Sequence, residues 1–348
     1  MIFFSFGLPS AFADWCERIL TELARHALGQ VEVVHANTLE DLGASVIRTG
    51  APHAVFCSRA PDARLSKVLA EAQLPFLFIL GDPKSTAAHL MQRGGASATH
   101  VAKVLGDGYA HLARYLDLPG AIVLQPESGS TRAADIVSLL NRRFALNLSE
   151  IALAEIVGET GEEPDENRGA VGEWWQSLSD AEHSLIEGMS ENYLNYFGAR
   201  ELKTITWQRE LFYLGDRPDS FTGPVDMTGR PRYLIRGPYI RLPLGAWTAR
   251  IVLGCSKEAT GVSLLVDICA GVRLNQKRVE LERGGVFEFY LPFTIDEQHD
   301  EPIDIRIFME KSAIDGLLSL SHVTLLREHE FDASKHVELT AELGLDAV

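Results

Sequence analysis

The sequence contains no long hydrophobic run and no basic cluster. No stretch of about 18 consecutive apolar residues occurs, so no membrane span is predicted. The formal net charge is −16, from 48 acidic and 32 basic side chains, and no group of Lys and Arg reverses this sign locally. A negative field repels the phosphates of nucleic acids and of anionic lipids, so nucleic acid is excluded as a partner.

Patterned cysteines and histidines are also lacking. The four cysteines have no CxxC or Cys/His spacing, lie in apolar segments and are interpreted as small core residues: Cys16, Cys57, Cys255 and Cys269. Four histidines have no ligand spacing with Asp or Glu, so no metal site is predicted: His35, His53, His89 and His100. No basic residue precedes the first apolar run, as it would in a secretory leader, and a cytoplasmic location is expected.

The first half of the chain alternates short apolar runs with amphipathic stretches. The apolar runs have the length of strands and are Ile2–Phe6, Val31–His35, His53–Ser58, Pro75–Leu80 and Ala121–Gln125. The intervening stretches, such as Phe12–Leu28, repeat apolar residues at the three-and-four spacing of one helix face. Strands without polar alternation, separated by helices, are typical of a parallel sheet covered on both faces. We therefore predict an α/β domain over residues 1–157.

The second half has a different period. From Thr204 onward apolar and polar residues alternate in short runs separated by turn residues, which predicts an antiparallel β-sandwich of jelly-roll type over residues 204–330. Residues 158–203 are interpreted as an acidic linker followed by connecting helices, with an apolar seam in Trp174–Phe197. Residues 331–348 are polar and are expected to form a tail.

The start of the chain combines a strand, a tight loop and a helix. Such a loop offers backbone N–H groups and the positive end of a helix dipole to a phosphate. Residues Gly7 to Trp15 resemble the opening of the sulfotransferase family, which reads G-x-P-R-S-G-T-S-W; Gly7, Pro9 and Trp15 fall in register. The family's later R-D-P landmark is similar in outline to Leu80-Gly81-Asp82-Pro83-Lys84. The resemblance implies a P-loop-like fold and a PAPS-type nucleotide near Gly7, Pro9, Ser10 and Lys84.

The sequence departs from the family at the charged positions. Ser10 stands where the family has its basic residue, Phe12 replaces the small glycine, and Asp14 adds a carboxylate to the first helical turn. Gly81 and His89 stand where the family's Arg and Ser hold the nucleotide 3′-phosphate. Each lost charge-assisted hydrogen bond costs about 1.5–3 kcal/mol. Gly7, Pro9, Ser10 and Lys84 are therefore interpreted as vestigial, with no catalytic residue and no cofactor expected.

Residues 237–249 resemble a phrase, PY-x-x-LP-x-G-x-Y, found in carbohydrate-binding β-sandwich domains of bacterial polysaccharide-associated proteins. The resemblance implies glycan binding, which needs aromatic faces beside hydroxyl-binding polar groups. Residues of these types are Tyr239, Arg250, Asp267, Arg273 and Tyr290. The alternative is that the tyrosines are packing residues and the charges are solvated.

Three functional hypotheses follow. The first is a non-catalytic sulfotransferase-like scaffold or glycan-binding protein in bacterial surface-polysaccharide biosynthesis, with polysaccharide or its synthesis proteins as partners. The second is an active sulfotransferase that uses a PAPS-type nucleotide on a carbohydrate. The third is an assembly protein whose sandwich docks other proteins or forms a homo-oligomer.

Overall fold

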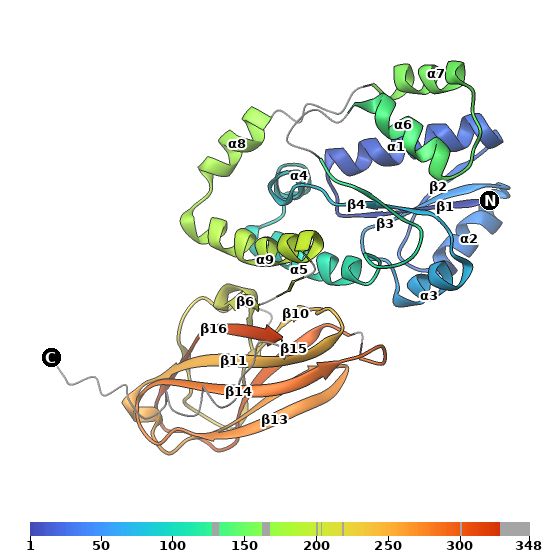
Figure 1. Cartoon of the computed structure of the whole chain (residues 1–348). Coiled ribbons are helices and arrows are strands. Elements are labelled where there is room, and N and C mark those ends of the chain that lie inside the picture. Colours follow the sequence, from blue (N-terminus) through green and yellow to red (C-terminus); the bar gives the residue numbers. More distant parts are fainter. Residues whose placement is uncertain are drawn as a thin grey trace. The chain divides into compact units, whose positions relative to one another are not determined.

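The computed structural model describes residues 1–126, 132–161, 168–199, 201–202, 204–217, 219–299 and 301–327. The chain forms two compact units (Figure 1). The first contains Met1–Tyr193 and Tyr239–Pro243, and the second contains Leu194–Pro238 and the chain from Leu244. The predicted tail, 331–348, and residues 162–167 of the predicted acidic linker lie outside the described residues.

The first unit is built on a five-stranded parallel sheet in the order β2-β3-β1-β4-β5. Its strands are β1 (Ile2–Gly7), β2 (Glu32–His35), β3 (Ala54–Ser58), β4 (Phe76–Ile79) and β5 (Ala121–Leu124). Parallel pairing joins β1 to β3 on one side and to β4 on the other. The predicted parallel sheet is thereby confirmed. In such sheets ligands usually bind at the carboxyl ends of the strands, where the chain leaves two neighbouring strands in opposite directions. The carboxyl end of the central strand β1 lies at this position.

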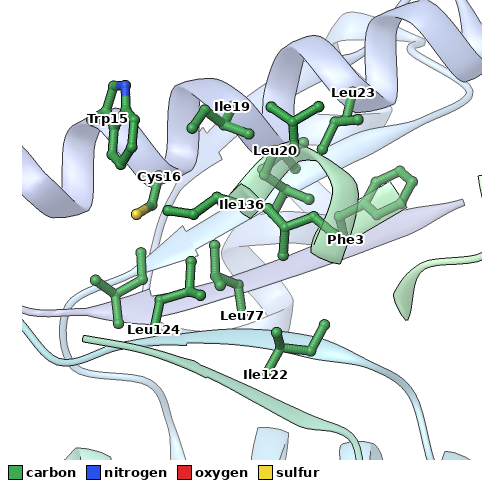
Figure 2. Packing of buried hydrophobic residues seen from close by; sticks show 14 of the residues in the cluster. Phe3, Trp15, Cys16, Ile19, Leu20, Leu23, Leu77, Ile122, Leu124 and Ile136 are labelled. Carbon is green, nitrogen blue, oxygen red and sulfur yellow. The ribbon is translucent and has the colours of Figure 1, made fainter. Parts of the chain in front are cut away.

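Helices cover both faces of this sheet (Figure 1). The described helices of the chain are α1 (Ala11–Leu28), α2 (Leu39–Thr49), α3 (Ala63–Ala72), α4 (Pro83–Gly94), α5 (Ala98–Ala113), α6 (Ala133–Arg143), α7 (Glu150–Thr160), α8 (Arg168–Ser177) and α9 (Asp180–Ala199); α7 packs on α1 and α6, and α8 on α4. Figure 2 shows Ile19 and Leu20 of α1 and Ile136 of α6 packed on Phe3 and Leu77 of the sheet. Because apolar residues recur along one side of α1, that helix buries a continuous stripe on this face.

Aromatic rings fill the other face of the sheet. Phe6 lies at the centre of this group, with its ring centroid 4.8 Å from that of Tyr115 and 5.5 Å from that of Phe76. These residues alternate with those of the α1 face, so β1 from Phe3 onward, β3 and β4 are buried on both sides, as their uninterrupted apolar runs predict. The edge strands differ, because His35 of β2 and Val123 of β5 are exposed. One boundary differs from the prediction: α7 continues to Thr160, and the loop expected from Gly158 begins only at Gly161, whose φ of +68° ends the helix.

The second unit contains two antiparallel sheets. The six-stranded sheet has the order β13-β12-β15-β9-β7 with β10 paired to β15, and the five-stranded sheet has the order β14-β11-β16-β6 with β8 paired to β16. The bounds are β6 (Thr204–Gln208), β7 (Tyr213–Leu214), β8 (Val225–Asp226), β9 (Arg232–Arg236), β10 (Pro238–Ile240), β11 (Gly245–Cys255), β12 (Ser263–Ala270), β13 (Val272–Glu280), β14 (Gly285–Ile295), β15 (Ile303–Met309) and β16 (Leu317–Arg327). Alternate residues of both sheets form the buried core, including Trp247, Ile251, Val266 and Ile307. The predicted antiparallel sandwich is confirmed.

Within the described ranges, no helix combines the length and the hydropathy that crossing a bilayer requires.

Candidate functional site

The loop after β1 uses its polar groups for the protein's own structure. Ser10 is fully buried and caps α1 by accepting a hydrogen bond from the backbone N–H of Ala13 at 3.0 Å. A Cβ at Gly7 would lie 2.8 Å from the Cβ of Ile79, so the approach of β1 to β4 requires glycine there. Pro9 is half-buried in the bend that connects Gly7 to Ser10. Capping and packing therefore account for Gly7 and Ser10 without a bound anion.

A cation does face this loop, although it comes from another strand. Arg59 directly follows β3 and donates from Nη1 to the carbonyl oxygen of Gly7 at 3.2 Å. Its Nη2 donates to Asp14 Oδ1 and to Glu17 Oε2, each at 3.1 Å. Two carboxylates of α1 thus surround one guanidinium, and its charge is neutralised within the protein. No sequence motif points to Arg59, which is distant from the loop along the chain. The parallel pairing of β3 with β1 places it beside Gly7.

Glu17 is the centre of a buried polar cluster. Glu17 is 5% exposed, and burial raises the pKa of its carboxyl to about 7, although the charge of Arg59 acts to lower this pKa. Burial also raises the pKa of the Cys57 thiol. His35 and Cys57 are register partners on β2 and β3. Ligand-type atoms of Glu17, His35 and Cys57 lie within 4.8 Å of one another, a grouping that sequence spacing cannot show because three separate elements supply it.

Lys84, near the N-terminus of α4, has partners on the helices that follow. Its Nζ lies 3.7 Å from Glu187 Oε1 and 4.6 Å from the ring centroid of Trp175. Trp175 in turn stacks on His183, with ring centroids 4.6 Å apart. The charge of Lys84 is therefore shared between a carboxylate and an aromatic ring. The structure thus gives separate local roles to the predicted nucleotide residues Gly7, Ser10 and Lys84.

On the second unit, Asp267 and Arg273 lie together on the outer face of the six-stranded sheet. Asp267 is 2% exposed and accepts hydrogen bonds from Arg306 Nε at 2.7 Å and Arg306 Nη2 at 2.6 Å. Arg273 adds a bond from Nε at 3.1 Å. The two arginines come from β13 and β15, the strands on either side of β12, so cross-strand pairing assembles the cluster.

An aromatic residue borders this cluster. The guanidinium carbons of Arg236 and Arg306 each lie 5.5 Å from the ring centroid of Tyr233, which also meets Phe308 edge to face at 5.0 Å. Arg236 Nη2 donates to Asp304 at 2.7 Å. We call Tyr233, Arg236, Asp267, Arg273, Asp304 and Arg306 the arginine face. Sequence reasoning missed Tyr233, Arg236 and Asp304, and the polar ends of the Arg232–Arg236 run were the available signal.

Arg250 and Tyr290 lie together on the other sheet. They are register partners on β11 and β14, and both contact Glu288: Arg250 Nη2 donates at 2.6 Å and the Tyr290 hydroxyl donates a short hydrogen bond. Burial and Glu288 raise the pKa of Tyr290 to about 12. Tyr239 lies in β10, 40% exposed, in the segment that clusters with the first unit. The five predicted glycan residues therefore form two pairs on two sheets, with Tyr239 in neither pair.

Comparison with known proteins gives structural likenesses only. No family model matches the chain, and no curated protein matches it. A mouse sulfotransferase complexed with PAP has a TM-score of 0.37 and 12% identity, over 54% of this chain and 83% of that chain. The C-terminal CBM6 of LamC, a marine laminarinase from Zobellia galactanivorans, has a TM-score of 0.23 and 9% identity, over 36% and 99%. An arabinose-bound α-L-arabinofuranosidase has a TM-score of 0.23 and 9% identity, over 30% of this chain and only 19% of that chain. At these scores the likenesses do not establish a family for the chain.

Proposed function

We propose that this protein is a non-catalytic glycan-binding scaffold that acts in bacterial surface-polysaccharide biosynthesis. The observation that carries the proposal is the arginine face, where a buried carboxylate holds two guanidinium groups beside an aromatic ring. The polysaccharide setting is supported by the resemblance of residues 237–249 to carbohydrate-binding sandwich domains.

The arginine face has the chemistry that sugars require. Within the described residues, Arg273 bonds through Nε alone, and its side chain is 49% exposed, so its Nη donors are available to hydroxyl or carboxylate oxygens. Asp267 fixes the positions of Arg273 and Arg306, which lowers the entropy lost when a ligand binds. The Arg250–Glu288 pair, by contrast, is an exposed cross-strand ion pair with no buried anchor. We therefore assign binding to the six-stranded sheet.

The non-catalytic part of the proposal rests on the loop after β1. Arg59, which donates to the Gly7 carbonyl, and Lys84 are already paired with Asp14, Glu17 and Glu187. A phosphosulfate would have to displace these carboxylates, at about 1.5–3 kcal/mol for each charge-assisted hydrogen bond that is broken. We infer that no PAPS-type nucleotide is held.

Glycan binding is tested by an array of neutral and uronic-acid glycans probed with the full chain, followed by calorimetry on each ligand found. Arg273→Gln is expected to weaken binding about tenfold, since one charge-assisted bond exceeds the 1.4 kcal/mol that a factor of ten represents. The matched control Arg250→Gln should bind as the parent does. Absence of any glycan ligand, or loss in the control alone, contradicts the assignment.

The non-catalytic inference is tested separately by titrating the sulfate-donor nucleotide PAPS into the full chain. We expect no heat of binding at micromolar concentrations, because paired cations and the first-turn carboxylate of Asp14 oppose an anion at this helix terminus. Micromolar affinity for PAPS would contradict the non-catalytic inference, whatever the glycan array shows.

A further inference from the structure

Three side chains with metal-binding atoms meet at the carboxyl edge of the parallel sheet. His35 ends β2, and Cys57 lies one residue before the end of β3. As register partners in a parallel pair, they point to the same face of the sheet. Glu17, in the second turn of α1, lies over this face. Cys57 and Glu17 are buried, whereas His35 is exposed, so the cluster is anchored inside the protein and open to solvent on one side.

We propose that Glu17, His35 and Cys57 bind one Zn²⁺ ion, with a fourth coordination position open to water. One imidazole nitrogen, one thiolate sulfur and one carboxylate oxygen are the ligand types that zinc prefers. Zinc is usually four-coordinate, so three protein ligands leave one position for water or another small ligand. Hard cations such as Mg²⁺ and Ca²⁺ prefer oxygen ligands and do not suit this set.

The distances suit a bound ion. Zinc bonds of about 2.0–2.3 Å at tetrahedral angles place the ligand atoms roughly 3.3–3.7 Å apart. The three ligand atoms lie within 4.8 Å of one another, so rotation of the exposed His35 side chain and small shifts of the other two close the site. Glu17 Oε1 is buried and lies 2.8 Å from Arg59 Nη1, so metal binding requires this carboxylate to turn from Arg59 toward His35 and Cys57.

Charge also balances when zinc is present. Binding displaces the thiol proton of Cys57 to solvent, as metal coordination does for thiols. The thiolate, Glu17 and Asp14 then carry three negative charges, and Arg59 carries one positive charge. Arg59 keeps its bonds to Asp14 and to the Gly7 carbonyl, so it can support the site while Glu17 turns to the metal. A divalent cation leaves the cluster neutral.

The test uses the full-length, untagged chain, stripped with a chelator and titrated with Zn²⁺ and with Co²⁺ as a spectroscopic substitute. We expect one ion per chain with micromolar or tighter affinity. The Co²⁺ form should show a thiolate-to-metal charge-transfer band and the strong visible bands of tetrahedral coordination. His35→Gln should weaken zinc binding about a hundredfold, since even outer-sphere partners of ligands change affinity by ~10–100-fold. Cys57→Ser should abolish the charge-transfer band.

Two matched controls make the result specific. His53→Gln removes a histidine at the opposite end of β3, and Cys16→Ser removes a buried cysteine adjacent to Glu17 in sequence. Both should bind zinc as the parent does. His35 is exposed, so its replacement should leave the fold intact, which circular dichroism would verify. A parent chain that takes up no zinc, or a folded His35→Gln variant with unchanged affinity, overturns the proposal.

Discussion

Replacing Asp267 with alanine is expected to lower the free energy of unfolding of the second unit by about 3–5 kcal/mol, the usual cost of removing one partner from a buried ion pair. The Asp267 side chain is 4% exposed and that of Arg306 is 20% exposed, so water replaces the lost carboxylate poorly. Arg306 loses two hydrogen bonds and Arg273 loses one. Two like charges then face each other across β12.

Urea unfolding followed by circular dichroism, at wavelengths that separate strand from helix signals, measures this loss in the second unit. The matched control is Glu288→Ala, which removes a carboxylate from the more exposed pair with Arg250 and should cost no more than about 1 kcal/mol. Adding Arg306→Met to the Asp267→Ala variant should recover stability, because it removes the orphaned cation. Equal losses in Asp267→Ala and Glu288→Ala would show that the Asp267 cluster is effectively solvated.

The two folds could be predicted because each follows from a periodic pattern. Uninterrupted runs such as Ile2–Phe6 predict strands buried on both faces, and the structure places β1 at the centre of the parallel sheet. Alternation such as that of Trp247, Ala249 and Ile251 predicts one buried face, and these residues form the sandwich core. Buried positions recur at a fixed spacing in each kind of strand, so they can be recognised in one sequence without knowledge of the fold.

The candidate sites could not be predicted to the same depth, because side chains distant in sequence assemble them. Alternation correctly places Asp267 on the outer face of β12, where a carboxylate is expected to be solvated. Arginines from both neighbouring strands cover it instead. Arg59 and Glu17 likewise meet through the pairing of β3 with β1, and His35 meets Cys57 through register. Parallel strands pair across long helical crossovers, so the spacing of these residues along the chain does not show which of them will be neighbours.

Glu17 is expected to make the stability of the metal-free protein fall as the pH rises from about 4.5 to about 7. Burial raises its pKa in the folded protein to about 7, from 4.5 for the free side chain. The folded chain therefore holds a proton that the unfolded chain releases in this range. Stability is then fully present below the lower value and is lost as the pH rises through the upper one. At 1.36 kcal/mol per pKa unit, the change is about 3 kcal/mol.

Glu17→Gln tests this directly, since a carboxamide has the shape of the protonated acid and does not titrate. Urea midpoints measured with chelator from pH 5 to pH 8 should vary less in this variant than in the parent. The difference should correspond to the Glu17 contribution alone, because the rest of the −16 charge is common to both chains. Glu22→Gln, on the same helix and paired with Arg25 at the surface, should keep the parent's slope. An unchanged slope in Glu17→Gln would mean that Arg59 holds Glu17 ionised across this range, and that its ion pair outweighs the cost of burial.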